Sequence, residues 1–377
     1  MPVYRSPLLL FVFENGVIML SNMIKAYFAI LSNFRKPISP LLTFSGLFTL
    51  RIIVSFGMFF DLLFFPSIRR KKIIKPIVIV GNPRSGTTFL QRFLVNQKIG
   101  VGLPLWKMLY PSLTLQKLIK PFLPLMEKFS PARFHFHAAH ETNLTAIETD
   151  DPSLLFHYFD GFFVYGFFLA WAKEDLKAHF DPQVRDTSKR DFNWLEKVWK
   201  RNMIGENHEQ VIGKLFSLAV RLPQFLNHFP DAKILYTIRD PLETVPSGLS
   251  LVTGVLDGRF GFWKLPDSKR ELYIERLYQA FLELSMRFHK DYIEDRIPKE
   301  KVKIVRYDRM MKDFDGLMGE LLPFIEIEPS PELLDTIKKT SEKQSTRKSE
   351  HKYSLEQFGL SEERIRRDYD SIYKTFF

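Results

Sequence analysis

The chain has 377 residues, of which 45% are hydrophobic, and this is enough apolar material for the core of one large α/β domain or two smaller domains. Its formal net charge of +11 suits an anionic nucleotide or an acidic membrane surface, whereas no zinc-finger, homeodomain or RNA-binding signature accompanies the charge, so we expect no nucleic-acid partner. The absence of cysteine excludes disulfides, thiolate catalysis and cysteine-ligated zinc.

Residues 1–72 form an apolar region that we predict to be helical and associated with a membrane. Residues 7–33 are apolar but interrupted by polar side chains, and residues 41–65 carry Arg51 and Asp61. The favourable insertion free energy of the Leu, Ile, Phe and Val residues in 41–65 is nearly offset by these two charges. A full membrane span is therefore only a marginal prediction.

A basic cluster, Arg69-Arg70-Lys71-Lys72, follows this apolar region immediately. By the positive-inside rule the cluster places the rest of the chain in the cytoplasm. We interpret the region as a peripheral or monotopic anchor on an anionic, cytosolic membrane surface. The alternative is a layer of helices packed on the rest of the chain; the length of the region and its density of Phe favour membrane contact.

Residues 77–90, with the sequence IVIVGNPRSGTTFL, predict a strand, a phosphate-binding loop and the start of a helix. Gly81 and Gly86 bracket the loop, where backbone amides and the helix dipole create a site for an anion. The spacing is that of a P-loop, but Thr87 stands where a nucleotide kinase carries lysine, and Arg84 lies inside the loop. Phosphoryl transfer is thereby disfavoured, whereas phosphate binding is not.

Residues 83–90 resemble the 5′-phosphosulfate loop of the sulfotransferases that use 3′-phosphoadenosine 5′-phosphosulfate (PAPS), in the broad group that contains many bacterial members and the tyrosylprotein sulfotransferases. The resemblance implies an α/β, P-loop-like domain over residues 73–377, with a mostly parallel central sheet and helices on both faces. It also implies transfer of a sulfuryl group from PAPS to an acceptor hydroxyl. The residues expected to bind the 5′ side of PAPS are Arg84, Ser85, Gly86, Thr87, Thr88 and Phe89.

A second segment, residues 231–241, supports the resemblance. It predicts a strand that ends at Arg239, followed by Pro241 in the first turn of a helix that contains Ser247. In the family, Arg and Ser at this spacing bind the 3′-phosphate, and a guanidinium fork with a hydroxyl suits that ligand. The alternative is a surface Arg239 paired with Asp240.

Weaker similarities extend the resemblance towards the C-terminus. Lys214 resembles the lysine that steadies the sulfuryl group, and Arg84 is expected to act beside it on the reacting group. Tyr307 belongs to a Tyr-Asp pair that resembles the one at a strand end in the family. Arg347 and Lys348 precede a segment similar to the family's C-terminal tail and are candidate contacts to the donor phosphate.

The base that removes the acceptor proton is the hardest residue to assign. Relatives often have a Glu soon after the first helix, where this chain has Lys107. Residues 140–151 instead match a His followed by an acidic cluster in the relatives, and a His or a buried carboxylate can serve as a base. The candidates are His140, Glu148, Asp150 and Asp151. The alternative for at least one Asp is to cap the aromatic segment that follows.

Residues 135–141 also contain possible zinc ligands, namely His135, His137, His140 and Glu141. The histidines lack the i,i+4 spacing of a helical zinc protease, and sulfuryl transfer requires no metal, so we predict no metal site.

Residues 154–171 are the most aromatic part of the chain. They either pack in the core or form a wall of an apolar acceptor pocket. In the second case, the acceptor is a hydroxylated lipid, a sterol-like molecule or another amphiphile. The alternative acceptor is a glycan hydroxyl. The alternative functions of the protein are those of a nucleotide kinase and of a membrane-bound nucleotide-binding protein without turnover.

Overall fold

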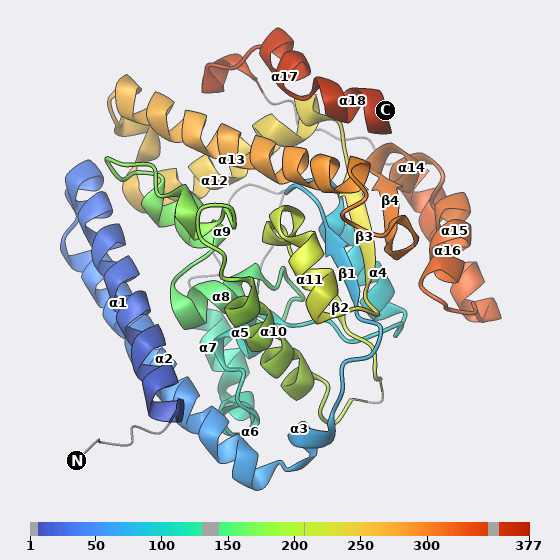
Figure 1. The fold of residues 1–377 in the computed structure, drawn as a ribbon, viewed down its shortest axis with the longest axis horizontal. Helices are drawn as coiled ribbons and strands as arrows, with labels where there is room; N and C mark the ends of the chain where they lie inside the picture. Colours follow the sequence, from blue (N-terminus) through green and yellow to red (C-terminus); the bar gives the residue numbers. More distant parts are fainter. Residues whose placement is uncertain (1–6, 130–142, 207, 346–353) are drawn as a thin grey trace.

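The computed structural model describes residues 7–129, 143–206, 208–345 and 354–377, with side chains described from residue 16 onward (Figure 1). Its centre is a four-stranded parallel sheet with the strand order β2-β1-β3-β4. The strands are β1 (Ile77–Val80), β2 (Ile212–Lys214), β3 (Lys233–Ile238) and β4 (Val302–Arg306). Because all four are parallel, the segments that follow them emerge at one edge of the sheet. The predicted α/β fold class is confirmed.

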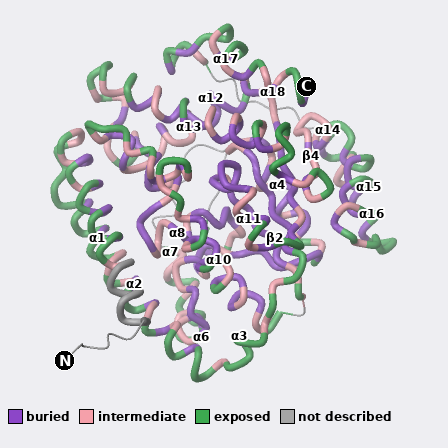
Figure 2. The backbone as a smooth tube through the Cα atoms, viewed as in Figure 1, coloured by how far each residue is buried: buried purple, intermediate pink, exposed green. Residues whose placement is uncertain are grey.

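Side chains on β1 alternate between two hydrophobic clusters, one on each face of the sheet. Ile77 and Ile79 join one cluster, and Val78 and Val80 join the other. The smaller cluster lies under α4 (Thr87–Asn96), α14 (Tyr307–Lys312), α15 (Phe314–Phe324) and α16 (Pro331–Ser345). The larger lies under α10 (Ser188–Asn202), α11 (Leu222–His228), α12 (Pro241–Phe260) and α13 (Asp267–Ile293). Figure 2 shows the sheet at the buried centre of the molecule.

Shorter elements connect this framework. Between β1 and β2 are α5 (Leu105–Leu109), α6 (Leu113–Ile119), η1 (Lys120–Phe122), α7 (Leu123–Phe129), α8 (Asp151–Tyr158), α9 (Phe162–Val164), the π-helix η3 (Tyr165–Leu169) and η4 (Lys177–His179). Later in the chain are η5 (Ser217–Val220), η6 (Phe262–Lys264), η7 (Lys299–Lys301), η8 (Glu356–Phe358), α17 (Glu362–Asp368) and α18 (Asp370–Phe376). Helices α17 and α18 pack on α12 and α13, which brings the C-terminal segment back to the sheet (Figure 1).

The N-terminal apolar region consists of α1 (Pro7–Phe34), α2 (Ile38–Phe64) and the single turn α3 (Ser67–Arg70). Helices α1 and α2 lie side by side on one flank of the molecule and pack against α6, α8 and η3 (Figure 1). The helical prediction for this region is confirmed, and the packing on the rest of the chain that was considered as the alternative to membrane contact is present. Within the described residues, both helices are also long and apolar enough to cross a membrane.

The two charged residues of α2 point into the protein. Arg51 donates from Nε to the carbonyl oxygen of His157 at 3.2 Å. Asp61 is fully buried; its carboxylate accepts hydrogen bonds from Arg201, at 2.8 Å, and from groups at the start of α6, including both the amide and the hydroxyl of Thr114. Because both charges are used inside the protein, the outer face of α2 carries no charged side chain and exposes apolar residues with a few hydroxyl residues among them.

Candidate functional site

The phosphate loop between β1 and α4 is held against β3 by close backbone packing. A Cβ at Gly81 would lie 2.4 Å from the carbonyl oxygen of Thr237, so only glycine allows this approach. Ser85 Oγ and Thr237 Oγ1 lie 2.7 Å apart and share a hydrogen bond. Gly86 and Arg84 both adopt positive φ, +88° and +74°. A left-handed conformation is uncommon for a residue with a side chain, and at Arg84 it marks a strained position in the predicted anion site.

The two predicted phosphate subsites are adjacent. Arg84 Nε donates to Ser247 Oγ at 3.0 Å, which joins the 5′-phosphosulfate loop to the predicted 3′-phosphate site on α12. Arg239 Nη1 donates to the carbonyl oxygen of Arg84 at 3.1 Å. The Arg239 guanidinium also lies 4.2 Å from the centre of the Tyr307 ring, within range of a cation–π interaction. Four of the predicted donor-binding residues therefore meet at the carboxyl ends of β1, β3 and β4.

The partner of Arg239 differs from the one considered as the alternative. Arg239 Nε donates to Glu243 Oε2 at 2.6 Å, one turn along α12. Asp240 instead caps α12, where its carboxylate accepts a hydrogen bond from the Leu242 amide at 2.9 Å, and it also accepts one from the Tyr373 hydroxyl. A phosphate bound at Arg239 would therefore compete with Glu243 and not with Asp240.

Lys214 lies at the end of β2, next to the first turn of α4. Its ammonium donates to Thr88 Oγ1 at 2.9 Å, and the residue is only 1% exposed. Burial lowers the pKa of Lys214 to about 8, although the negative charge of Glu148 opposes this shift. The predicted Lys214 thus lies at the N-terminus of the helix that follows the phosphate loop, where the helix dipole already favours an anion.

The three described carboxylates among the candidate bases have different environments. Glu148 forms an ion pair with Arg92 of α4 at 3.0 Å and lies close enough to Lys214 to act on its pKa. Asp150 is fully buried, where burial raises its pKa well above the usual range, and one carboxylate oxygen accepts from the Lys214 amide at 3.1 Å. Asp151 accepts hydrogen bonds from the amides of residues 216 and 217 at the start of η5.

The proposed capping role of the aspartates takes an unexpected form. Asp150 occupies the N-cap position of α8, but its side chain makes no capping hydrogen bond to that helix. Asp151 instead satisfies amides at the start of η5, a segment that is distant in sequence. The two aspartates therefore fasten the start of α8 to the segment that carries Lys214.

Other predicted residues are placed less centrally. Thr87 is buried in the first turn of α4, and the ring of Phe89 packs against Phe314, with 5.4 Å between ring centres. Lys107, which replaces the usual Glu, donates to Asn202 Oδ1 at 2.9 Å. His140, Arg347 and Lys348 lie outside the described residues, as do the other possible zinc ligands. Within the described parts of the chain, no three His, Asp or Glu side chains gather as a possible metal site.

The structure adds two residues that the sequence reasoning missed, Arg92 and Thr237. Arg92 lies one helical turn after Thr88, and this spacing could have indicated that both face the same site. No sequence signal indicates Thr237, because its role depends on the alignment of β3 beside β1.

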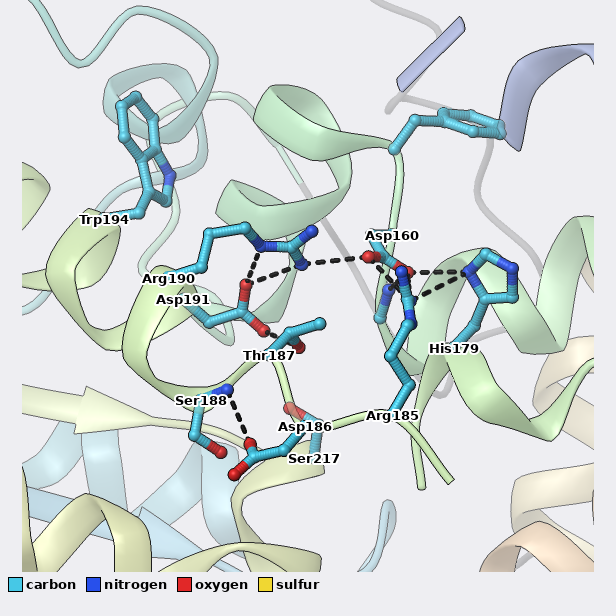
Figure 3. Close-up of polar contacts among 12 residues, drawn as sticks. Asp160, His179, Arg185, Asp186, Thr187, Ser188, Arg190, Asp191, Trp194 and Ser217 are labelled. Atoms are coloured by element: carbon cyan, nitrogen blue, oxygen red, sulfur yellow. Dashed lines mark hydrogen bonds and ion pairs between the residues drawn. The ribbon is translucent and has the colours of Figure 1, made fainter. Parts of the chain in front are cut away.

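Asp160, within the aromatic segment, belongs to a network of charged side chains (Figure 3). Asp160, in the turn between α8 and α9, accepts hydrogen bonds from Arg185 at 2.6 Å and from Arg190 at 2.9 Å, and lies 2.7 Å from His179 Nδ1. Burial alone would raise the pKa of Asp160, but His179 and the two arginines hold it well below its usual value. The turn that begins α9 is thereby fixed by charged groups of the protein itself.

In this α/β fold, the two predicted phosphate subsites lie next to each other at the carboxyl ends of the parallel strands. Residues 76–331 match the model of the sulfotransferase family, and the chain belongs to that family. It is accordingly an enzyme of the class that uses PAPS as the sulfuryl donor, and the predicted family and enzyme class are confirmed.

Two solved structures share the fold. Sulfotransferase STF1 from Mycobacterium tuberculosis H37Rv matches 94% of this chain and 92% of its own, at 18% identity and a TM-score of 0.67. Sulfotransferase STF9 from Mycobacterium avium matches 90% of this chain and 86% of its own, at 15% identity and a TM-score of 0.66. A match over 94% of the chain cannot be confined to residues 73–377, so part of the N-terminal helical region belongs to the shared fold. No curated protein matches the chain.

Proposed function

We propose that this sulfotransferase transfers the sulfuryl group of PAPS to a hydroxyl of an amphiphilic molecule at an anionic, cytosolic membrane surface. The assignment of PAPS as the donor is supported by the hydrogen bond between Arg84 and Ser247, which joins the proposed loop for the 5′-phosphosulfate to the proposed site for the 3′-phosphate. PAPS carries phosphate groups at both positions, so one molecule satisfies both subsites.

In this reaction the acceptor oxygen forms a bond to sulfur while the bond from sulfur to the 5′-phosphate oxygen breaks. The products are a sulfate ester and adenosine 3′,5′-bisphosphate. Negative charge grows on the leaving phosphate, where Arg84, Lys214 and the amides at the start of α4 provide positive charge. These groups are held in place before the substrates bind, so little reorganisation is required.

We assign the removal of the acceptor proton to Glu148. Asp151 has its oxygens occupied by backbone amides, and Asp150 is fully enclosed behind Lys214. Glu148 forms an ion pair with the partly exposed Arg92 and lies close enough to Lys214 to act on its pKa, which places this carboxylate beside the group that acts on the donor. A positioned base of this kind contributes about 10²- to 10⁴-fold to the rate.

Replacing Glu148 by Gln tests this assignment. We expect kcat to fall by about 10²- to 10⁴-fold, while the affinity for adenosine 3′,5′-bisphosphate stays unchanged, because Glu148 does not belong to the phosphate subsites. The matched control is Glu206→Gln, which changes an exposed carboxylate away from the loop. Full activity of Glu148→Gln would contradict this assignment and favour His140 as the base.

The membrane part of the proposal is supported by the outer face of α1 and α2. This face exposes large apolar side chains, among them Val17, Leu20, Ile24, Phe28, Leu41, Leu42, Ile53, Phe56, Phe60 and Leu63. Leu118, Phe122 and Leu125 extend it onto α6, η1 and α7. An exposed apolar surface of this kind is unfavourable in water and marks an interaction site. We refer to it below as the apolar face.

Basic residues accompany the apolar face, as binding to anionic lipid requires. Arg69, Arg70 and Lys72 are exposed directly after α2, and Lys117 and Lys120 are exposed on α6 and η1, beside the apolar residues. Each cation near an anionic surface contributes about 1 kcal/mol. Because Arg51 and Asp61 hold α2 along the body of the protein, we place the helices on the membrane surface, not across it.

The decisive experiment incubates the enzyme and labelled PAPS with separate extracts of membrane lipids and glycans. We expect label in the lipid fraction, and we expect Arg84→Ala to abolish it. Label confined to the glycan fraction would refute the amphiphilic acceptor. An unlabelled result in both fractions, with adenosine 3′,5′-bisphosphate still bound, would favour a nucleotide-binding protein without turnover.

Membrane binding is measured by sedimentation with vesicles of phosphatidylcholine, with and without phosphatidylserine. We expect binding to require phosphatidylserine. Binding should weaken about tenfold in Phe60→Glu, because the variant lacks an aromatic ring that the wild-type protein buries in the membrane. Leu334→Glu, at an exposed leucine on α16, is the control. Equal binding of both variants would show that the apolar face does not contact lipid.

A further inference from the structure

A row of aromatic rings connects α2 to the catalytic lysine. Its members, in order from the lysine, are Phe216, Phe163, Phe167, Phe168 and Phe44. The ammonium of Lys214 lies 5.6 Å from the centre of the Phe216 ring. Phe216 stacks on Phe163 with 6.3 Å between ring centres, and Phe163 stacks on Phe167 at 5.9 Å. We call this set the aromatic row.

The row ends at the N-terminal helices. Phe167 and Phe168 are adjacent in the π-helix η3, with ring centres 6.4 Å apart. Phe168 meets Phe44 of α2 edge to face at 5.9 Å. Each step between neighbouring rings is therefore close enough for direct aromatic contact, and the row ends at Phe44, a buried ring of the helix whose outer side belongs to the apolar face.

Four rings of the row are packed less completely than the rings beside them, whereas the fifth, Phe44, is buried. Phe163, Phe167, Phe168 and Phe216 are all partly exposed, whereas the neighbouring Phe159 and Phe162 are buried in the core. Among the described residues, neither Phe163 nor Phe216 belongs to the two core clusters or to the partly buried residues packed on them. Core packing therefore does not account for the two rings nearest Lys214.

Two rings of the row, Phe167 and Phe168, lie on the π-helix η3. A π-helix is rare and is most often found at functional sites. The turn before α9, the short helix that carries Phe163 and leads into η3, is held by Asp160 and its arginines, as Figure 3 shows, and Gly161 in this turn adopts a φ of +92°. These three rings are thus presented by a held backbone, which reduces the entropy lost when a ligand binds.

We propose that the aromatic row binds the hydrocarbon part of the acceptor and leads it from the apolar face to Lys214. This inference rests on the proposed function and specifies its substrate: an amphiphile with one extended hydrocarbon chain and a hydroxyl at the end that reaches the sulfuryl group. The rings offer apolar contact along the chain, and at its inner end the row reaches Lys214, the cation that acts on the donor.

The test uses three straight-chain primary alcohols, namely hexanol, decanol and hexadecanol, as acceptors with labelled PAPS. Each methylene of the alcohol that lies on the row should raise kcat/KM by about fourfold. This increase should stop once the hydrocarbon chain of the alcohol is longer than the row. In Phe163→Ala and Phe167→Ala, we expect hexadecanol to lose about tenfold more kcat/KM than hexanol. Phe324→Ala, which removes a partly exposed ring of α15 on the far side of the sheet, should lower all three equally.

A second measurement does not depend on turnover or on the variants folding. A hexadecanol analogue that carries a diazirine is irradiated with the wild-type enzyme and adenosine 3′,5′-bisphosphate, and the labelled peptides are identified by mass spectrometry. We expect label at the peptide that contains Phe163 and Phe167. Label confined to the outer surface of α1 and α2 would overturn the inference.

The outcomes separate this inference from the proposed function. Sulfated alcohols with no dependence on chain length, or with equal losses in the row variants and in Phe324→Ala, would overturn the row and leave the sulfotransferase assignment intact. Label on the row with no sulfated alcohol, lipid or glycan would support the row and refute the proposed function. Absence of both label and sulfated alcohol would overturn the row, while the lipid and glycan extracts decide the function separately.

Discussion

The activity of the enzyme should fall at alkaline pH when Lys214 loses its proton, and this alkaline limit should lie at a lower pH than an exposed lysine would give. The proposed role requires the protonated form, because only the ammonium can stabilise negative charge on the leaving phosphate. Burial has lowered the pKa of Lys214 to about 8, from the 10.5 of an exposed lysine. We therefore expect kcat/KM for PAPS to be constant below pH 8 and to fall about tenfold per pH unit above it.

Donor binding changes the position of this limit in a defined direction. Bound PAPS brings negative charge next to Lys214, which favours the ammonium and raises its pKa. The alkaline limit in kcat, which reports the enzyme with bound substrate, should therefore lie at higher pH than the limit in kcat/KM, which reports the free enzyme. The assay is release of labelled product under initial-rate conditions from about pH 6 to about pH 10.

Two substitutions distinguish the effect of the positive charge at position 214 from the effect of its titration. Lys214→Arg keeps a cation that does not titrate in this range, so the alkaline limit should disappear even if kcat is reduced. Lys214→Met removes the cation and should lower kcat by about 10²- to 10³-fold, equivalent to about 3–4 kcal/mol of transition-state stabilisation. Lys107→Met, at a partly buried lysine whose pKa is also lowered by burial, should leave the limit in place. An unchanged limit in Lys214→Arg would refute the assignment.

Three further predictions concern the donor site and the fold. Arg239→Ala should weaken PAPS binding about 10- to 100-fold and leave the binding of adenosine 5′-phosphosulfate unchanged, because that molecule lacks the 3′-phosphate. Glu243→Gln should strengthen PAPS binding about two- to fivefold, because it removes the carboxylate that competes for Arg239. Calorimetric titration measures both affinities. Gly86→Ala should cost about 1–2 kcal/mol in thermal unfolding, because it forces a side chain into positive φ. Asp61→Ala should cost about 3–5 kcal/mol in urea unfolding by leaving Arg201 buried and unpaired, and Asp61→Ala/Arg201→Met should recover part of this loss.

The strands and helices that carry the predicted donor-binding residues were largely predictable, because each element is local in sequence. The strand, loop and helix of residues 77–96 follow from β-branched residues, glycines and helix-forming residues within one short segment. The strand that ends before Arg239 and the helix that begins at Pro241 were likewise readable from neighbouring residues, and both are present. Parallel strands then bring Arg84 and Arg239 together, because the ends of such strands share one edge of the sheet.

The acidic residues show where prediction from sequence stops. Glu148, Asp150 and Asp151 are close in the chain and were equivalent as candidate bases. Their difference arises from distant partners: Arg92 on α4 pairs with Glu148, while amides after β2 bind the two aspartates. Burial and hydrogen bonding determine which carboxylate can accept a proton, and both depend on contacts between segments that are far apart in the sequence.

The sequence by itself determined the family, the α/β fold and the donor, because the phosphate loop requires particular residues at fixed local positions. Only the tertiary structure decided how the apolar residues are used. Hydropathy could not show that Arg51 and Asp61 turn inward, since their partners lie in other helices. Nor could the order of phenylalanines in the chain reveal a row from Phe44 to Phe216, because ring contacts form between residues that only folding brings together.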